Sequence, residues 1–187
     1  YPQPISPTAK SQTLYSTPPE EAYRLVMQES DNFVAEQLLL LCSNQVFDTL
    51  NTKKIIKYAQ EQFLADLPDR PIWVDGSGLS RYNLITPRTR TNLLQKMYQL
   101  AGWEYLQSIF PAGGKSGSIK NWYGGNETPY IFAKTGTLSN KHCLSGYLKA
   151  KSGKLLVFSF MHNNYTSGSQ PLMEEMEKVL KSIYLQY

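Results

Sequence analysis

The residues that could do chemistry are concentrated in one short stretch, Lys134-Thr135-Gly136-Thr137. Four apolar or β-favouring residues, Tyr130 to Ala133, precede it, and a turn at Leu138 to Lys141 follows it. The stretch is therefore expected near the end of a β-strand. A glycine inside a strand leaves room for another backbone or a ligand to lie close. One ammonium group and two hydroxyls would thus stand beside a position that is open to a ligand, although such a tripeptide also occurs in ordinary loops.

A second polar group, Ser30-Asp31-Asn32, interrupts a helical pattern. These residue types prefer caps and turns to helix interiors, so they should separate two helices. The first helix is expected to begin at Thr17-Pro18-Pro19-Glu20, with a hydroxyl cap and an early proline. The second, Phe33 to about Cys42, is apolar on nearly every side and should be buried. A buried helix would bring the three polar side chains inside the molecule, where each needs a partner; the alternative is a simple N-cap.

The remaining pattern predicts a mixed α+β fold in which an antiparallel sheet is flanked by helices. The sheet is expected as a meander of three strands: Tyr130 to Thr137, Cys143 to Ala150, and Lys154 to Met161. A tight turn at Lys151-Ser152-Gly153 would join the last two strands. The other expected elements are a helix from Asn51 to about Leu64, a short strand at 71–74, a helix from Thr86-Pro87 to Gly102, a short helix at 103–110 and a final helix capped by Ser169.

Composition excludes several classes of protein. With 187 residues, 41% of them hydrophobic and 18% charged, the chain is long enough for a real core and unlike disordered proteins. The net charge of +4 is scattered, which gives no reason to expect nucleic acid as a partner. The longest apolar run, Leu38 to Cys42, is too short to span a membrane. The chain begins at Tyr1 without a signal peptide, so it is expected to be a mature or excised piece.

Neither cysteines nor histidines form a metal or cofactor pattern. Cys42 and Cys143 lack metal-ligand spacing and are expected as buried free thiols, on a helix and on a strand, with a disulfide as the alternative. His142 and His162 are expected to be packing residues. We therefore expect no metal and no cofactor.

Four segments, taken in order, resemble one known family. They are Ser30-Asp31-Asn32 with the helix at 33–38, the loop Asp75 to Arg81 (Asp-Gly-Ser-Gly-Leu-Ser-Arg) with Asn83-Leu84, the stretch 111–113 with 117–121, and Lys134 to Ser139. Their order and spacing are similar to those of the class C low-molecular-mass penicillin-binding proteins, the D-alanyl-D-alanine carboxypeptidase/endopeptidase family. The resemblance runs from about Thr13 to the C-terminus.

One departure from the family is important. The family's nucleophile is the serine of a Ser-x-x-Lys motif, and no serine of this chain has a lysine three residues later. The resemblance therefore implies that residues 1–187 are the C-terminal portion of the penicillin-binding domain, without the acylating serine. Residues 1–15 would be an irregular lead-in. The chain alone would then be inactive as an enzyme.

The resemblance also implies roles for three catalytic residues. Ser30 would relay a proton between the lysine of the nucleophile and the leaving amine. Asn32 would hydrogen-bond the substrate's backbone carbonyl and that lysine. Lys134 would orient Ser30 and attract the terminal carboxylate of the substrate.

Substrate binding would fall to the next three residues. The hydroxyls of Thr135 and Thr137 would donate to the carboxylate, and the Thr137 backbone N–H would be one of two oxyanion donors. Gly136 would let the substrate backbone pair along the strand edge. Asp75, Ser77 and Arg81 would be structural or would lie at the rim of the substrate site.

The implied protein is a periplasmic or cell-envelope serine peptidase of the β-lactamase/transpeptidase-like fold. Its substrate would be a peptidoglycan stem peptide ending in D-Ala-D-Ala, and it would bind β-lactams. Its partner would be the missing N-terminal part, or a second copy of the chain, because an exposed strand edge would make the piece marginally stable. The alternatives are a non-catalytic module that binds peptidoglycan peptides and an unrelated α+β protein with accidental motifs.

Overall fold

The computed structural model describes residues 19–125 and 127–187, so the expected lead-in and the cap at Thr17 lie outside the described residues. One antiparallel sheet has the order β1-β2-β3, from β1 (Ile131–Leu138), β2 (Lys141–Lys149) and β3 (Leu155–Asn163). The helices are α1 (Pro19–Arg24), the π-helical turn η1 (Leu25–Glu29), α2 (Asn32–Phe47), α3 (Thr52–Gln62), α4 (Pro87–Ala101), α5 (Trp103–Ile109), the 3-10 turn η2 (Gly117–Ile119) and α6 (Gln170–Gln186). The predicted meander is confirmed.

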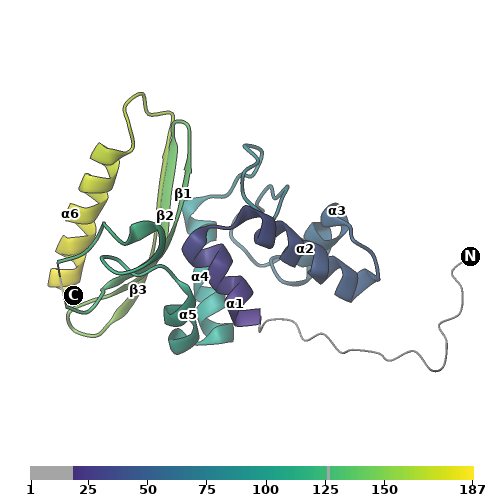
Figure 1. Ribbon diagram of the computed structural model, residues 1–187, viewed down its shortest axis with the longest axis horizontal. Coiled ribbons are helices and arrows are strands. Elements are labelled where there is room, and N and C mark those ends of the chain that lie inside the picture. The colour runs from purple at the N-terminus through teal and green to yellow at the C-terminus, as the bar shows by residue number, and fades with distance from the viewer. Residues whose placement is uncertain (1–18, 126) are drawn as a thin grey trace, which may run out of the picture.

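Helices cover both faces of the sheet, as the family resemblance implies: α6 packs on one face, and α4 and α5 pack on the other (Figure 1). Successive side chains of a strand point to opposite faces, so each strand supplies both cores. The core on the α6 side contains Ile131, Leu144, Leu148, Met176 and Leu180. The core on the opposite side contains Leu94, Leu106, Ile109, Phe110, Phe132 and Tyr147.

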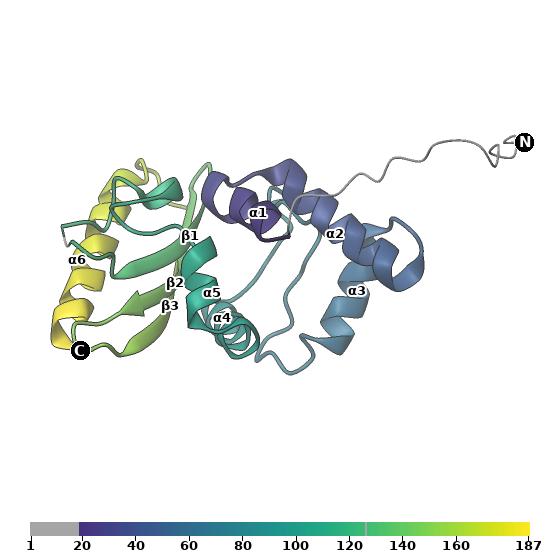
Figure 2. The same cartoon turned by 60° about the horizontal axis from the view of Figure 1, so that its bottom comes forward.

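The helices α2 and α3 lie at the end of the molecule away from α6 (Figure 2). The helix α2 packs against α3 through the small cluster Leu39, Ile55 and Ile56. Asn51 begins α3 as expected, because its side chain accepts a hydrogen bond from the backbone of Lys54 at 3.0 Å. A long irregular segment then leads from α3 to α4.

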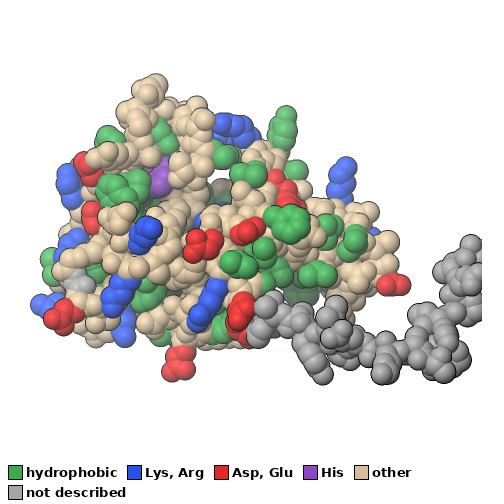
Figure 3. All heavy atoms as spheres, viewed as in Figure 1, with side chains coloured by type: hydrophobic (Ala, Val, Ile, Leu, Met, Phe, Trp, Pro, Cys, Tyr) green, Lys and Arg blue, Asp and Glu red, His purple; other side chains and the backbone are tan. Residues whose placement is uncertain are grey.

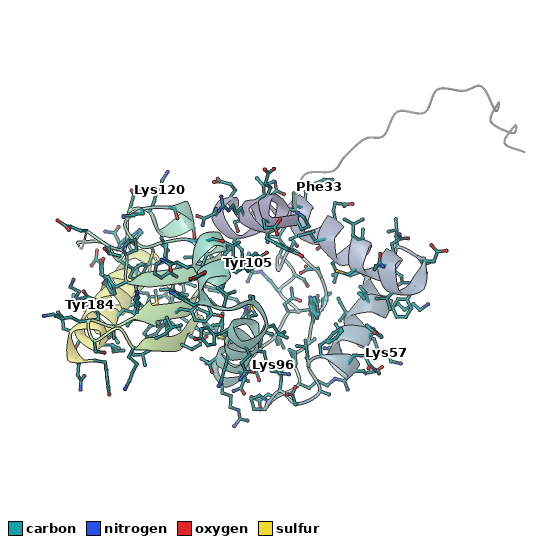
Figure 4. The ribbon with its side chains drawn as sticks, turned by 90° about the horizontal axis from the view of Figure 1, so that it is seen from below. Phe33, Lys57, Lys96, Tyr105, Lys120 and Tyr184 are labelled. Carbon is teal, nitrogen blue, oxygen red and sulfur yellow. The ribbon has the colours of Figure 1, made fainter. Side chains whose placement is uncertain are left out.

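The expectation that α2 is buried is wrong. Only Leu39 and Ser43 of this helix are fully buried, whereas Phe33 is 71% exposed and points outward in Figure 4. In the described residues α2 packs against α3, η1 and the loop at 75–81, and these contacts leave Phe33 and Leu41 mostly in solvent. Figure 3 shows hydrophobic side chains at the surface in this region. Cys42 is accordingly exposed and Cys143 only half-buried, so the expected burial is wrong, while both cysteines are free thiols as expected.

The short strand expected at 71–74 is also absent. Within the described residues this stretch forms one isolated antiparallel pair, between Ile72 and Leu84. The side-chain oxygen of Asn83 accepts a hydrogen bond from the backbone N–H of Val74 at 2.8 Å, so a side chain replaces the backbone hydrogen bonds that a strand would need.

No helix among the described residues has both the length and the apolar character to cross a membrane.

Close packing of β1 on β2 depends on Gly146. A β-carbon at Gly146 would lie 2.2 Å from the carbonyl oxygen of Phe132 and 2.6 Å from Cα of Ala133. Both of these atoms belong to the backbone of β1, so they cannot move aside without breaking the strand pair. Gly136, on β1, has open space at the corresponding position.

We expect Gly146→Ala to lower the free energy of unfolding by about 3 kcal/mol or more, because the new methyl group overpacks two paired strands. Gly136→Ala is the matched control and should change it by less than about 1 kcal/mol. Urea unfolding followed by circular dichroism measures both. Equal midpoints for the two variants would contradict the account of this strand pair.

Candidate active site

The outer edge of β1 is covered over its first half and open over its second half. The segment that follows α5 pairs with it: the Gly113 N–H donates to the carbonyl of Ile131 at 2.9 Å, and the Ala133 N–H donates to the carbonyl of Pro111 at 3.0 Å. Beyond Ala133 that segment turns away into η2. The stretch Lys134 to Thr137 therefore lies on an edge without a strand partner among the described residues, and a ligand could pair with it.

The structure brings two of the predicted catalytic residues together. The Nζ atom of Lys134 donates a hydrogen bond to Oγ of Ser30 at 2.8 Å, across 104 positions of sequence. The same Nζ atom also donates to the carbonyl of Thr135 at 2.9 Å. The lysine is therefore held at two points, with its ammonium group beside an exposed hydroxyl.

The backbone around Ser30 explains how its hydroxyl reaches Lys134. Ser30 adopts a left-handed conformation (φ 58°, ψ 41°) between the π-helical turn η1 and α2. A non-glycine residue in this region is uncommon, and both such strain and π-helical turns recur at functional sites. The next residue, Asp31, is the N-cap of α2, and its Oδ1 accepts from the backbone of Val34 at 2.9 Å. The alternative of a simple N-cap is thus correct for Asp31, while Ser30 bonds to Lys134.

Asn32 begins α2 directly after this cap and is exposed. It therefore lies at the surface, two residues after Ser30 in the sequence.

Partial burial lowers the pKa of Lys134 below the usual lysine range, because removal from water disfavours the charged form. A lysine of this kind changes its charge at a lower pH than an exposed one.

Ser118 is a site residue that the sequence reasoning missed. The Thr135 hydroxyl donates to Oγ of Ser118, at the start of η2, at 2.7 Å. Gly117 has φ 59°, and a β-carbon there would meet Oε1 of Gln28 and Cβ of Pro111, each at 2.8 Å. The tight fit locks the Ser118 loop against the helical turn that precedes Ser30. The motif match to residues 117–121 marked this loop but gave Ser118 no role.

The last two residues of the stretch are both exposed. Gly136 leaves open space beside the strand. The Oγ1 atom of Thr137 lies 2.9 Å from Nδ1 of His142, so this hydroxyl also has a neighbour on β2. His142 is buried, as expected of a packing residue, but it touches a predicted site residue.

The loop Asp75 to Arg81 is held by its own carboxylate, which favours the structural interpretation of Asp75. Oδ1 of Asp75 accepts from the Gly78 N–H at 2.7 Å, and Oδ2 accepts from the Ser80 N–H at 2.7 Å. Glu36 of α2 fixes the loop from outside, since its Oε1 accepts from the backbone of Gly76 and Ser77, each at 3.0 Å. The loop and α2 therefore form one unit.

Comparison with known proteins decides the family. The sequence profile of the D-Ala-D-Ala carboxypeptidase 3 (S13) family matches residues 5–182. The chain belongs to this family. The resemblance inferred from the four motifs is confirmed.

A curated family relative is D-alanyl-D-alanine carboxypeptidase DacB of Haemophilus influenzae. It is 28% identical over 164 residues, which make up 82% of this chain and 33% of the relative. The chain thus spans about a third of the length of this relative.

Two solved structures show that the fold is shared. The crystal structure of penicillin binding protein 4 (dacB) from Haemophilus influenzae, complexed with a β-lactam, matches with a TM-score of 0.77 at 24% identity, over 88% of this chain and 41% of that chain. The TLA-1 extended-spectrum β-lactamase matches with a TM-score of 0.65 at 15% identity, over 88% of this chain and 62% of that chain. The described chain is therefore part of a β-lactamase/transpeptidase-like fold.

The environment of Lys134 predicts its titration. We expect the pKa of the Lys134 ammonium group to be lower than that of an exposed lysine, because the partly buried site disfavours the charge. Lys178 is the comparison within the same sample, since its hydrogen bond to Glu175 raises its pKa. Nuclear magnetic resonance of the lysine side-chain carbons against pH measures both, and the reverse order would contradict the described burial.

Proposed function

We propose that this chain forms the substrate-binding half of a serine-type D-Ala-D-Ala carboxypeptidase/endopeptidase that acts on peptidoglycan stem peptides and binds β-lactams in the cell envelope. The observation that carries the proposal is the contact between Lys134 and Ser30, which unites two of the four motifs. Membership of the carboxypeptidase family supports the reaction class.

Peptide acyl transfer needs an activated hydroxyl, an oxyanion hole, a proton donor for the leaving amine and a clamp for the substrate. In the proposed site the ammonium group of Lys134 orients Ser30 and attracts the terminal carboxylate. The Ser30 hydroxyl, already paired with Lys134 at 2.8 Å, relays a proton to the leaving amine. Asn32 would hold the substrate's backbone carbonyl.

The open half of the β1 edge would bind the substrate backbone as an added strand. Gly136 leaves space for that approach. The Thr137 backbone N–H would be one oxyanion donor, and the hydroxyls of Thr135, Thr137 and Ser118 would surround the carboxylate. No metal or cofactor takes part in this scheme.

The acylating serine and its lysine would come from a part of the protein outside this sequence. Two features support packing of such a part here. The outer edge of β3 has no strand partner among the described residues, and Phe33 and Leu41 of α2 are 71% and 60% exposed. Self-association through these surfaces is the other expected outcome and stays a prediction.

A second candidate is a non-catalytic module that binds peptidoglycan peptides. It is favoured by the fact that the Lys134–Ser30 contact forms within a chain that contains no Ser-x-x-Lys motif. Both candidates use the same clamp, namely Lys134 to Thr137 on the open half of the β1 edge. They differ only in whether a nucleophile is supplied.

We expect this chain to form no covalent adduct with benzylpenicillin, because its hydroxyls lack the activating lysine of the family. Intact mass spectrometry after incubation of the chain alone measures this. A stoichiometric penicilloyl adduct would mean that a serine of this chain, first of all Ser30, is the nucleophile, and the role proposed for it would be wrong.

We expect N-acetyl-D-Ala-D-Ala to bind along β1, and Lys134→Met to weaken this binding by roughly tenfold or more, because a charge-assisted hydrogen bond is lost. Chemical-shift titration of the backbone amides measures the affinity. Lys178→Met, which removes an exposed charge from α6, is the matched control and should leave the affinity unchanged.

The same binding should weaken as the pH rises through the lowered pKa of Lys134, since only the charged lysine attracts a carboxylate. Lys134→Arg should keep its affinity to higher pH, because arginine stays charged. Equal affinities for the unmodified chain and Lys134→Met would contradict the proposed clamp.

A further inference from the structure

A row of three polar side chains crosses the sheet beside the proposed clamp. Thr137 on β1 is paired in register with His142 on β2, and His142 is paired with His162 on β3. Directly opposite residues of antiparallel strands point to the same face, so the three side chains lie side by side. The row ends at the hydroxyl that the proposed function places beside the substrate carboxylate.

His142 is the buried member of this row. Its side chain is 2% exposed, and its Nδ1 atom lies 2.9 Å from Oγ1 of Thr137. Its Nε2 atom is buried and has no hydrogen-bond partner among the described residues. Burial, and to a lesser extent the nearby His162, lower the pKa of His142, so the ring is neutral at pH 7.

A neutral imidazole carries one proton, and its position determines what Thr137 can do. If the proton were on Nε2, a buried N–H donor would be left without an acceptor, and Thr137 would donate its own proton to Nδ1. If the proton is on Nδ1, it is satisfied by Oγ1 of Thr137, and only an acceptor lone pair is left unpaired at Nε2. An orphaned buried donor is rarer than an unpaired acceptor, which favours the second arrangement.

We propose that His142 is a positioning residue: its Nδ1–H donates to Oγ1 of Thr137 and leaves the Thr137 hydroxyl proton free to donate to a carboxylate ligand. This inference rests on the proposed function for the identity of the ligand. The orientation of the hydroxyl itself follows from the unliganded chain.

The neighbouring threonine supplies a contrast on the same strand. The Thr135 hydroxyl already donates to Ser118 at 2.7 Å, so its proton is engaged before a ligand arrives. A ligand carboxylate would have to displace Ser118 or accept the Ser118 hydroxyl proton instead. The two threonine hydroxyls are therefore not equivalent, and Thr137 is the prepared donor.

The first test reads the tautomer of His142 in the unmodified chain by long-range nitrogen–proton correlation at neutral pH. The chain has two histidines, so His162→Gln assigns the signals. We expect Nδ1 of His142 to be protonated and Nε2 to be bare. A ring protonated on Nε2 would overturn the proposal, and this readout needs neither a ligand nor a folded variant of His142.

The second test is a double-mutant cycle on the binding of N-acetyl-D-Ala-D-Ala. We expect His142→Leu to weaken binding roughly 2- to 10-fold, the range for one neutral hydrogen bond. His142→Asn should keep most of the affinity, because its amide can donate from about the place of Nδ1. In a Thr137→Val background, His142→Leu should have no further effect.

Full additivity of the two substitutions would overturn the proposal, since His142 would then act independently of the Thr137 hydroxyl. If the unmodified chain failed to bind the peptide, the proposed function would be contradicted. The tautomer would still decide the part assigned to His142.

Discussion

Half of the outer edge of β1 is saturated by backbone hydrogen bonds, and half is not. The segment Pro111 to Gly113 satisfies the edge as far as Ala133, and then turns away. An unpaired strand edge in the middle of a protein surface is a liability unless it binds something. The open half runs from Lys134 to Thr137, where Ser30, Ser118 and His142 contact the strand's side chains.

The side chains at this edge are fixed by contacts with neighbouring segments before any ligand is present. Lys134 donates a hydrogen bond to Ser30, which lies between η1 and α2. Thr135 donates to Ser118 in the loop after α5, and Thr137 lies against His142 of β2. Each contact restricts one rotor, so less conformational entropy is lost when a substrate binds. The left-handed backbone at Ser30 is the local strain that accompanies this order.

Burial of apolar side chains is uneven along the chain. The sheet and its two cores are well buried, whereas α2 leaves apolar side chains in solvent (Figure 3). Exposed apolar side chains of this kind mark a surface for further protein contact. The described chain is thus well packed around the sheet and leaves apolar side chains uncovered on α2.

The sequence by itself determined the local elements and the family. Runs of β-favouring residues and the turn at Lys151 to Gly153 were sufficient to predict the meander, and the Asn51 cap marked a helix start, because these signals act within a few residues. Ser169 precedes α6 as expected, but its side chain makes no cap hydrogen bond. The motif around Lys134 likewise marked the stretch that lies on the unpaired half of the β1 edge. The exposure of α2 could not be predicted from its composition, since burial depends on what the rest of the chain supplies as cover.

The contacts of the site were decided by the tertiary structure alone. Ser30 meets Lys134 across 104 positions only because a strained residue redirects the chain between two helices and because the β1 edge is left half open. Ser118 and His142 were not recognised as neighbours of the site, since a serine in a glycine-rich loop and a histidine in a strand give no local signal of what they will touch. Hydrogen bonds between distant segments depend on the whole path of the backbone, which no short stretch of sequence specifies.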